Sequence, residues 1–85
     1  MKFSERLREL RLGKKLSVKQ LARILKLSPS TIYKYERGET LPNIEQVLYI
    51  CTFFLVKVDY ILGLKDDPEP YNKDILIESR NKLFN

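Results

Sequence analysis

The stretch from residue 16 to residue 38, LSVKQLARILKLSPSTIYKYERG, constrains the fold most, because it predicts two short helices with a tight turn between them. Ser17 and Gln20 have the spacing of a capping box, in which each side chain accepts a hydrogen bond from the other residue's backbone N–H. The second helix is predicted to begin at Pro29 behind a Ser28 cap. The chain must therefore build its fold around a rigid helix-turn-helix, at about residues 17 to 37.

The apolar residues of these two helices indicate which faces are buried. In the first helix they recur with helical spacing and form one stripe, made by Val18, Leu21, Ala22 and Leu25. In the second helix Ile32 and Tyr35 are predicted to point inward, and Gly38 to end the helix in the left-handed conformation. The opposite face of this helix forms a solvent-facing arc that consists of Pro29, Ser30, Tyr33, Lys34 and Arg37.

The surrounding segments predict three further helices. Residues 4 to 13, with Ser4 as the expected cap, are amphipathic, and their apolar face carries Phe3, Leu7 and Leu10. Residues 44 to 54, behind an Asn43 cap, are predicted to bury Ile44, Val47, Leu48, Cys51 and either Phe54 or Leu55. A short helical turn at 58 to 62 ends at Gly63. With no strand-like alternation, the fold class is all-α, a compact bundle of five helices.

The domain is predicted to occupy residues 1–64, and residues 65–85 are expected to form an acidic, proline-containing connector and a short C-terminal segment. The connector sequence KDDPEPYN contains two prolines and cannot continue a helix. The apolar pattern of residues 73 to 84 is weak. It leaves open whether this tail forms a sixth helix.

Composition argues against enzymatic chemistry. The chain has 85 residues, one cysteine and no histidine, which excludes an intramolecular disulfide, a histidine-containing zinc site and a histidine acid or base. No serine stands with a lysine base in a credible motif, and Cys51 is best interpreted as a core residue. We expect no enzyme activity, no cofactor and no metal. Without a signal peptide or an apolar run of membrane-spanning length, a cytoplasmic location is expected.

The net charge of +5 is distributed unevenly. Residues 1–37 hold 11 Lys and Arg against 3 Glu, a net charge of +8, whereas residues 38–64 carry −2 and residues 65–85 carry −1. A field with this polarity attracts a polyanion to one surface, although a solvated basic face that aids solubility is the alternative. Charge alone does not separate DNA from RNA or anionic lipid.

Residues 3 to 63 resemble the Xre family, the Cro and repressor-like helix-turn-helix DNA-binding domains of phages and bacteria. The resemblance rests on RLRELR at 6–11, LSVKQLA at 16–22, LSPSTIYKYERG at 27–38 and VDYILG at 58–63. It implies a five-helix domain that binds a double-stranded DNA operator, usually a palindrome, as a homodimer. It further implies a transcriptional regulator, most often a repressor.

In this docking mode the solvent-facing arc of the second helix enters the major groove. The expected base-reading residues are Pro29, Ser30, Tyr33 and Lys34. Phosphate contacts are expected near the two helix N-termini and on the arc, from Arg11, Ser17, Lys19, Gln20, Ser28, Thr31 and Arg37. Alternatively, the two serines serve only as caps and the lysine is only solvated.

The resemblance also implies an ion pair between Arg11 and Glu36, which would fix the second helix of the helix-turn-helix against the helix of residues 4 to 13 and hold Arg11 near a phosphate. An exposed pair of little energetic value is the alternative. Some residues depart from the family pattern: Lys26 stands where glycine is common in the turn, Val18 stands at an often polar position, and Glu39 and Leu41 replace residues that are commonly basic. At Glu39 and Leu41 we expect weaker contact with the DNA backbone.

A second surface is predicted at Tyr49, Phe53 and Val56, which lie off the apolar stripe of residues 44 to 54 or follow it. It could be a self-complementary dimer interface, a surface covered by the C-terminal segment, or a set of isolated surface aromatics. The competing functional hypothesis uses the same surface. It is a protein-interaction module, such as an antitoxin or an anti-repressor-binding protein, with a regulatory protein as its partner.

Overall fold

The structure, a computed structural model, describes residues 2–65, and all the regular elements of this part are helices. They are α1 (Phe3–Gly13), α2 (Val18–Leu25), α3 (Pro29–Glu36), α4 (Ile44–Phe54) and α5 (Val58–Ile61). The all-α, five-helix fold predicted from the sequence is therefore confirmed. The connector and the sixth helix considered for the C-terminal segment lie outside the described residues.

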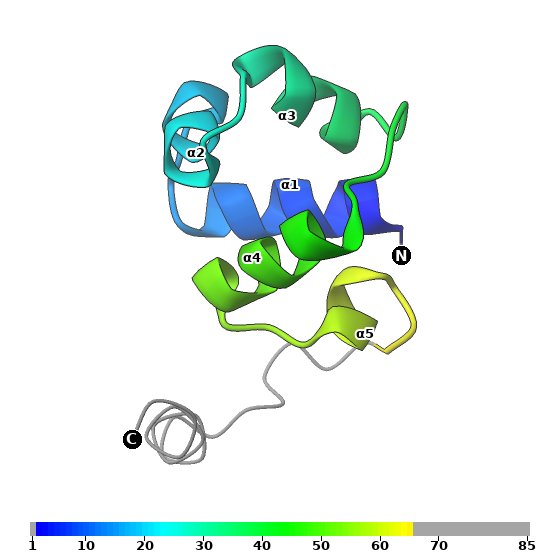
Figure 1. The fold of residues 1–85 in the computed structure, drawn as a ribbon. Coiled ribbons are helices and arrows are strands. Elements are labelled where there is room, and N and C mark those ends of the chain that lie inside the picture. The colour runs from blue at the N-terminus through cyan, green and yellow to red at the C-terminus, as the bar shows by residue number, and fades with distance from the viewer. Residues whose placement is uncertain (1, 66–85) are drawn as a thin grey trace, which may run out of the picture.

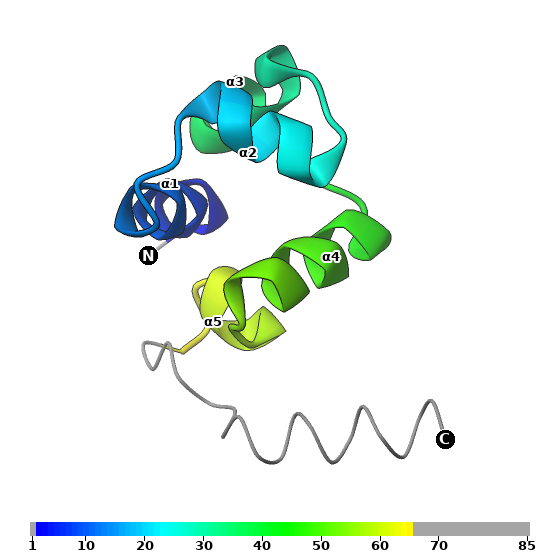
Figure 2. The same ribbon diagram turned by 90° about the vertical axis from the view of Figure 1, so that its left-hand side faces the viewer.

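In the view of Figure 1, helix α1 lies between α3 and α5. It contacts α3 on one side and α5 on another, while α4 contacts α5. Helix α2 packs against α3, with which it makes the helix-turn-helix (Figure 2). Because α3 touches both α1 and α2, two other helices determine its orientation.

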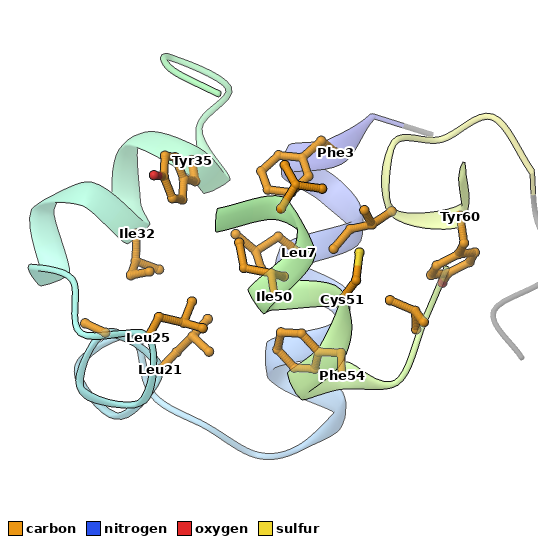
Figure 3. Close-up of a cluster of buried hydrophobic side chains, with 14 of the residues drawn as sticks. Phe3, Leu7, Leu21, Leu25, Ile32, Tyr35, Ile50, Cys51, Phe54 and Tyr60 are labelled. Carbon is orange, nitrogen blue, oxygen red and sulfur yellow. The ribbon is translucent and has the colours of Figure 1, made fainter. Parts of the chain in front are cut away.

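A single apolar core joins the helices (Figure 3). Its most deeply buried large side chains are Leu7, Leu21, Ile32, Ile50 and Ile61, all fully shielded from solvent. Each such side chain stabilises the fold by about 1.5 to 3 kcal/mol through burial. Ile32 and Tyr35 of α3 belong to this core, as predicted, so the helix with the polar arc is held by its opposite face.

The helix N-termini follow the predicted caps in three of the five helices. In α2, Ser17 Oγ accepts from the Gln20 backbone N–H at 3.0 Å, and Gln20 Oε1 accepts from the Ser17 N–H at 2.8 Å, which completes the capping box. In α3, Ser28 Oγ accepts from the Thr31 N–H at 3.2 Å, and in α4 the Asn43 side chain caps in the same way. The cap expected at Ser4 is wrong: α1 begins at Phe3, and its N-cap Lys2 makes no side-chain cap hydrogen bond.

All five helices end in the same way. After each one a residue has a positive φ, between 57° and 82°, and these residues are Lys15, Lys26, Gly38, Leu55 and Gly63. The next N–H then bonds back to a carbonyl of the last helical turn, for example Leu27 to Ala22 O at 2.8 Å and Glu39 to Lys34 O at 2.9 Å. This is the Schellman motif. It makes the connectors short and rigid, at a cost of about 1 kcal/mol or more at each non-glycine residue.

The buried face of α4 differs from the prediction. Val47, Cys51 and Phe54 are buried as expected, but Ile50 replaces Ile44 and Leu48, which are 65% and 50% exposed. Ile44 is the first residue of the helix. The buried face is rotated about the helix axis relative to the predicted stripe, and it consists of Val47, Ile50, Cys51 and Phe54. The sequence could not decide between these faces, because apolar residues lie on nearly every side of α4.

Candidate nucleic-acid interface

The arc predicted on α3 is open to solvent. Its members Pro29, Ser30, Tyr33, Lys34 and Arg37 are all exposed, while Ile32 and Tyr35 on the other side are buried. The arc contains two cations, two hydroxyl groups and a pyrrolidine ring, and it contains no acidic side chain. Such a surface can donate hydrogen bonds to the acceptor groups of a polyanion.

Aromatic contacts hold the C-terminal half of α3 in place. The Tyr35 ring meets the Phe3 ring of α1 edge to face, with 6.2 Å between centroids and 71° between planes. Such a pair adds about 0.5 to 1.5 kcal/mol to the value of burial. Together with Ile32 in the core, it prevents α3 from rolling about its own axis, so the direction of the exposed arc is fixed.

The ion pair between Arg11 and Glu36 is present and nearly enclosed. Arg11 Nε donates to Glu36 Oε2 at 2.7 Å and Nη2 donates to Oε1 at 2.9 Å, with side chains only 10% and 7% exposed. Arg11 Nη1 also donates to the Leu16 carbonyl at 2.9 Å, a partner that the sequence did not indicate. One guanidinium thus joins α1, the connector to α2 and the last turn of α3.

The charge state of Arg11 follows from these contacts. The hydrogen bonding of Arg11 to the Glu36 carboxylate raises the pKa of the guanidinium above its ordinary value, although burial acts in the opposite direction. Arg11 therefore keeps its charge. Glu36 and Leu16 accept hydrogen bonds from three of its five N–H groups.

The other predicted phosphate-binding residues lie at the surface, apart from Thr31, which is partly buried. The capping box uses the Ser17 oxygen and the Gln20 carbonyl as acceptors, so the hydroxyl hydrogen and the amide NH₂ stay available as donors. At α3, Ser28 Oγ lies 2.9 Å from Thr31 Oγ1. Lys19 is exposed in the first turn of α2. Capping and anion binding are therefore compatible at both helix N-termini.

Arg37 has a partner that the sequence did not predict. Its Nη2 lies 3.2 Å from Glu39 Oε2, and both side chains are open to water, 60% and 51% exposed. The two residues are separated by Gly38, whose positive φ of 73° turns the chain back toward α3. An acidic side chain therefore stands beside the cation at the end of the arc.

The second predicted surface is only partly as expected. The prediction that Val56 lies on the surface is wrong, because its side chain is only 5% exposed. The left-handed turn at Leu55 directs Val56 into the core, and the Val56 N–H donates to the Cys51 carbonyl at 3.1 Å. Phe53 is half-buried and packs edge to face on Phe54, with 4.9 Å between centroids. Tyr49 is exposed, and its hydroxyl lies 3.5 Å from the Ile24 carbonyl of α2. Of the three predicted residues, Tyr49 is the one that is exposed, and Ile44 and Leu48, which were predicted to be buried, are exposed on the same helix.

The fold and the arc together define a class, the helix-turn-helix DNA-binding domains. A family model described as helix-turn-helix matches residues 7–61, and the chain belongs to this family, in its Xre-type, Cro-like branch. No helix in residues 2–65 is long and apolar enough to cross a membrane.

Named relatives agree with this assignment. The chain is 38% identical over 68 residues to the uncharacterized HTH-type transcriptional regulator YobD of Bacillus subtilis (strain 168), covering 80% of this chain and 61% of YobD. It is 44% identical over 63 residues to the HTH-type transcriptional activator BcrR of Enterococcus faecalis, covering 74% of this chain and 31% of BcrR. The chain thus spans less than two thirds of the length of these two relatives. Both relatives are named as HTH-type regulators of transcription.

Proposed function

We propose that this protein binds specific double-stranded DNA sequences by inserting α3 into the major groove. One observation carries the proposal: a polar, cationic arc is exposed on a helix whose opposite face is locked into the core. An α-helix fits the width of the major groove, where each base pair presents a distinct pattern of donors and acceptors. The base-reading residues in this proposal are Pro29, Ser30, Tyr33 and Lys34.

In the same proposal, flanking groups position the domain on the backbone. Lys19 and the free donors of Ser17 and Gln20 serve the N-terminus of α2, while Ser28 and Thr31 serve that of α3. Arg11 and Arg37 contribute near the C-terminal end of α3. The excess of positive charge in residues 1–37 supports this orientation.

We further propose that a homodimer binds a palindromic operator and represses transcription by occupying it. Two copies related by a two-fold axis would place their α3 helices in successive turns of the groove, about 34 to 36 Å apart. The exposed apolar side chains Ile44, Leu48 and Tyr49 support an interface on α4. Deletion of residues 66–85 followed by measurement of the mass in solution tests this: a surviving dimer supports α4, and loss of the dimer assigns the contact to the tail.

Selection of bound sequences from a random DNA pool, repeated at several salt concentrations, tests DNA binding. We expect an enriched palindrome and a log affinity that falls with log salt by about 0.9 for each neutralised phosphate. Failure to enrich any sequence, with a flat salt dependence, would refute the proposal and favour the protein-interaction module.

Lys34→Ala tests the base-reading role. Loss of one good base contact removes about 1 to 3 kcal/mol of discrimination, so the variant should relax the preference at one operator position per half-site. Lys65→Ala is the charge-matched control, because Lys65 is exposed near the end of α5 and pairs only loosely with Asp59 at 3.7 Å. A uniform loss of affinity in Lys34→Ala, equal for all sequences, would reassign Lys34 to phosphate.

A reporter gene downstream of the selected operator decides the direction of regulation. Repression is expected when the operator overlaps the promoter, because the bound dimer then excludes polymerase. Activation is the second candidate, since BcrR is named as an activator. A rise in expression from an operator placed upstream of the promoter would establish it.

A further inference from the structure

The segment that ends α3 fixes the position of an acidic residue. Gly38 N–H bonds Tyr35 O at 3.1 Å and Glu39 N–H bonds Lys34 O at 2.9 Å, the two hydrogen bonds of a Schellman motif. Glu39 is thereby attached to the last turn of α3 through its own backbone. Its carboxylate is carried at the C-terminal end of the arc, wherever α3 is placed.

The nearest cation to this carboxylate is Arg37. Arg37 Nη2 and Glu39 Oε2 are 3.2 Å apart. The other acidic residue at this end of α3, Glu36, is engaged by Arg11 through two hydrogen bonds and is nearly buried. Among the residues that the structure describes, Glu39 is therefore the carboxylate that competes with a phosphate for Arg37.

We propose that Glu39 acts as a built-in attenuator of DNA affinity, because it pairs with Arg37 on the surface that faces the DNA. The inference rests on the proposed DNA-binding function and adds to it a residue that sets the strength of backbone contact. A phosphate approaching Arg37 must displace the carboxylate, and the carboxylate itself repels the phosphate. An arginine that remains paired with Glu39 releases no counterion from the DNA, which also lowers the salt dependence.

Glu39→Gln tests the proposal on the full chain with the selected operator. The variant should bind about two- to fivefold more tightly for each protomer, which is the value of an exposed ion pair expressed as a fold-change. The plot of log affinity against log salt should become steeper by about 0.9 for each protomer as Arg37 gains a phosphate. Because the cap uses the Glu39 backbone N–H, the melting temperature should stay close to that of the wild type.

Glu9→Gln is the matched control. It changes the net charge by the same amount at an exposed position of α1 and should alter the affinity by less than about twofold, since distant surface charges are screened. A second test repeats Glu39→Gln in the Arg37→Gln background. There the gain should shrink to the size of the Glu9→Gln effect and the slope should not change.

Equal gains in Glu39→Gln and Glu9→Gln would overturn the proposal, and so would a gain in Glu39→Gln that persists undiminished without Arg37. Failure of the proposed function is recognised separately, since in that case the wild-type chain itself selects no DNA. A wild-type chain that binds its operator, together with an unchanged Glu39→Gln, would leave DNA binding intact and remove the attenuator.

Discussion

Replacing Glu36 by glutamine should destabilise the fold far more than a change of one surface charge would. The carboxylate accepts two charge-assisted hydrogen bonds from Arg11 at 2.7 and 2.9 Å, in a place where both side chains are about nine-tenths buried. Glutamine keeps one acceptor oxygen, but its NH₂ group then faces an Arg11 donor. The guanidinium is left charged, enclosed and short of one partner.

The magnitude follows from this geometry. Removal of one partner from a buried ion pair costs about 3 to 5 kcal/mol. The lower end applies here, about 3 kcal/mol, because Arg11 keeps its hydrogen bond to the Leu16 carbonyl. In a domain of this size that corresponds to a fall in melting temperature of about 12 to 24 °C. Thermal and urea unfolding followed by circular dichroism measures it.

Glu39→Gln supplies the control, because it breaks an ion pair of the same chemical type that is open to water and worth at most about 1 kcal/mol. A Glu36→Gln variant that melts within about 4 °C of the wild type, the shift expected for about 1 kcal/mol or less, would refute the argument. The double change Arg11→Met with Glu36→Leu should recover most of the lost stability, since apolar groups of similar volume satisfy each other. If Arg11 also binds a DNA phosphate, the double variant should bind DNA more weakly than the wild type even though its stability is restored.

Lys26→Gly should stabilise the fold by about 0.5 to 1 kcal/mol, because glycine adopts the φ of 58° without steric cost. The greater conformational freedom of glycine in the unfolded chain offsets part of this gain. A lower urea midpoint than that of the wild type would contradict the prediction. Burial raises the pKa of the Cys51 thiol to about 11, from an ordinary value of 9.0, so the unfolded thiol ionises first. The free energy of unfolding should therefore fall as the pH rises from about 9 to 11, by about 3 kcal/mol at most. Urea unfolding at pH 8 and pH 10.5 measures this, and Cys51→Ala should show a smaller difference between the two.

Local signals predicted the helix-turn-helix well. The Ser17 capping box, the Ser28 cap with Pro29 and the left-handed Gly38 each depend on interactions within a few residues, and each is present in the structure. The stripe of α2 and the inward positions of α3 were also predicted correctly, because most of the remaining positions of both helices carry polar residues. The Arg11 and Glu36 pair, separated by 25 residues, came from the family resemblance and not from any local pattern.

The failures lie where the local pattern left alternatives open. On α4, Ile44 and Ile50 are equally apolar, and only packing in the common core selects Ile50 for burial. Val56 looked like a surface residue because nothing in the sequence announces that Leu55 takes the left-handed conformation, a state uncommon for a branched side chain. The pairing of Arg37 with Glu39 was missed because it is a contact between two exposed side chains, which no sequence pattern specifies.

The division of α3 into two faces has a consequence for how such a protein can change its target. Ile32 and Tyr35 maintain the fold, whereas Ser30, Tyr33 and Lys34 are exposed and contribute little to it. Substitutions on the exposed face therefore alter the stability by only about 0.5 kcal/mol or less. Under the proposed function, a few surface mutations, each tolerated by the fold, can therefore change the DNA sequence that the protein binds. Ile32 and Tyr35 meanwhile keep α3 in the same orientation.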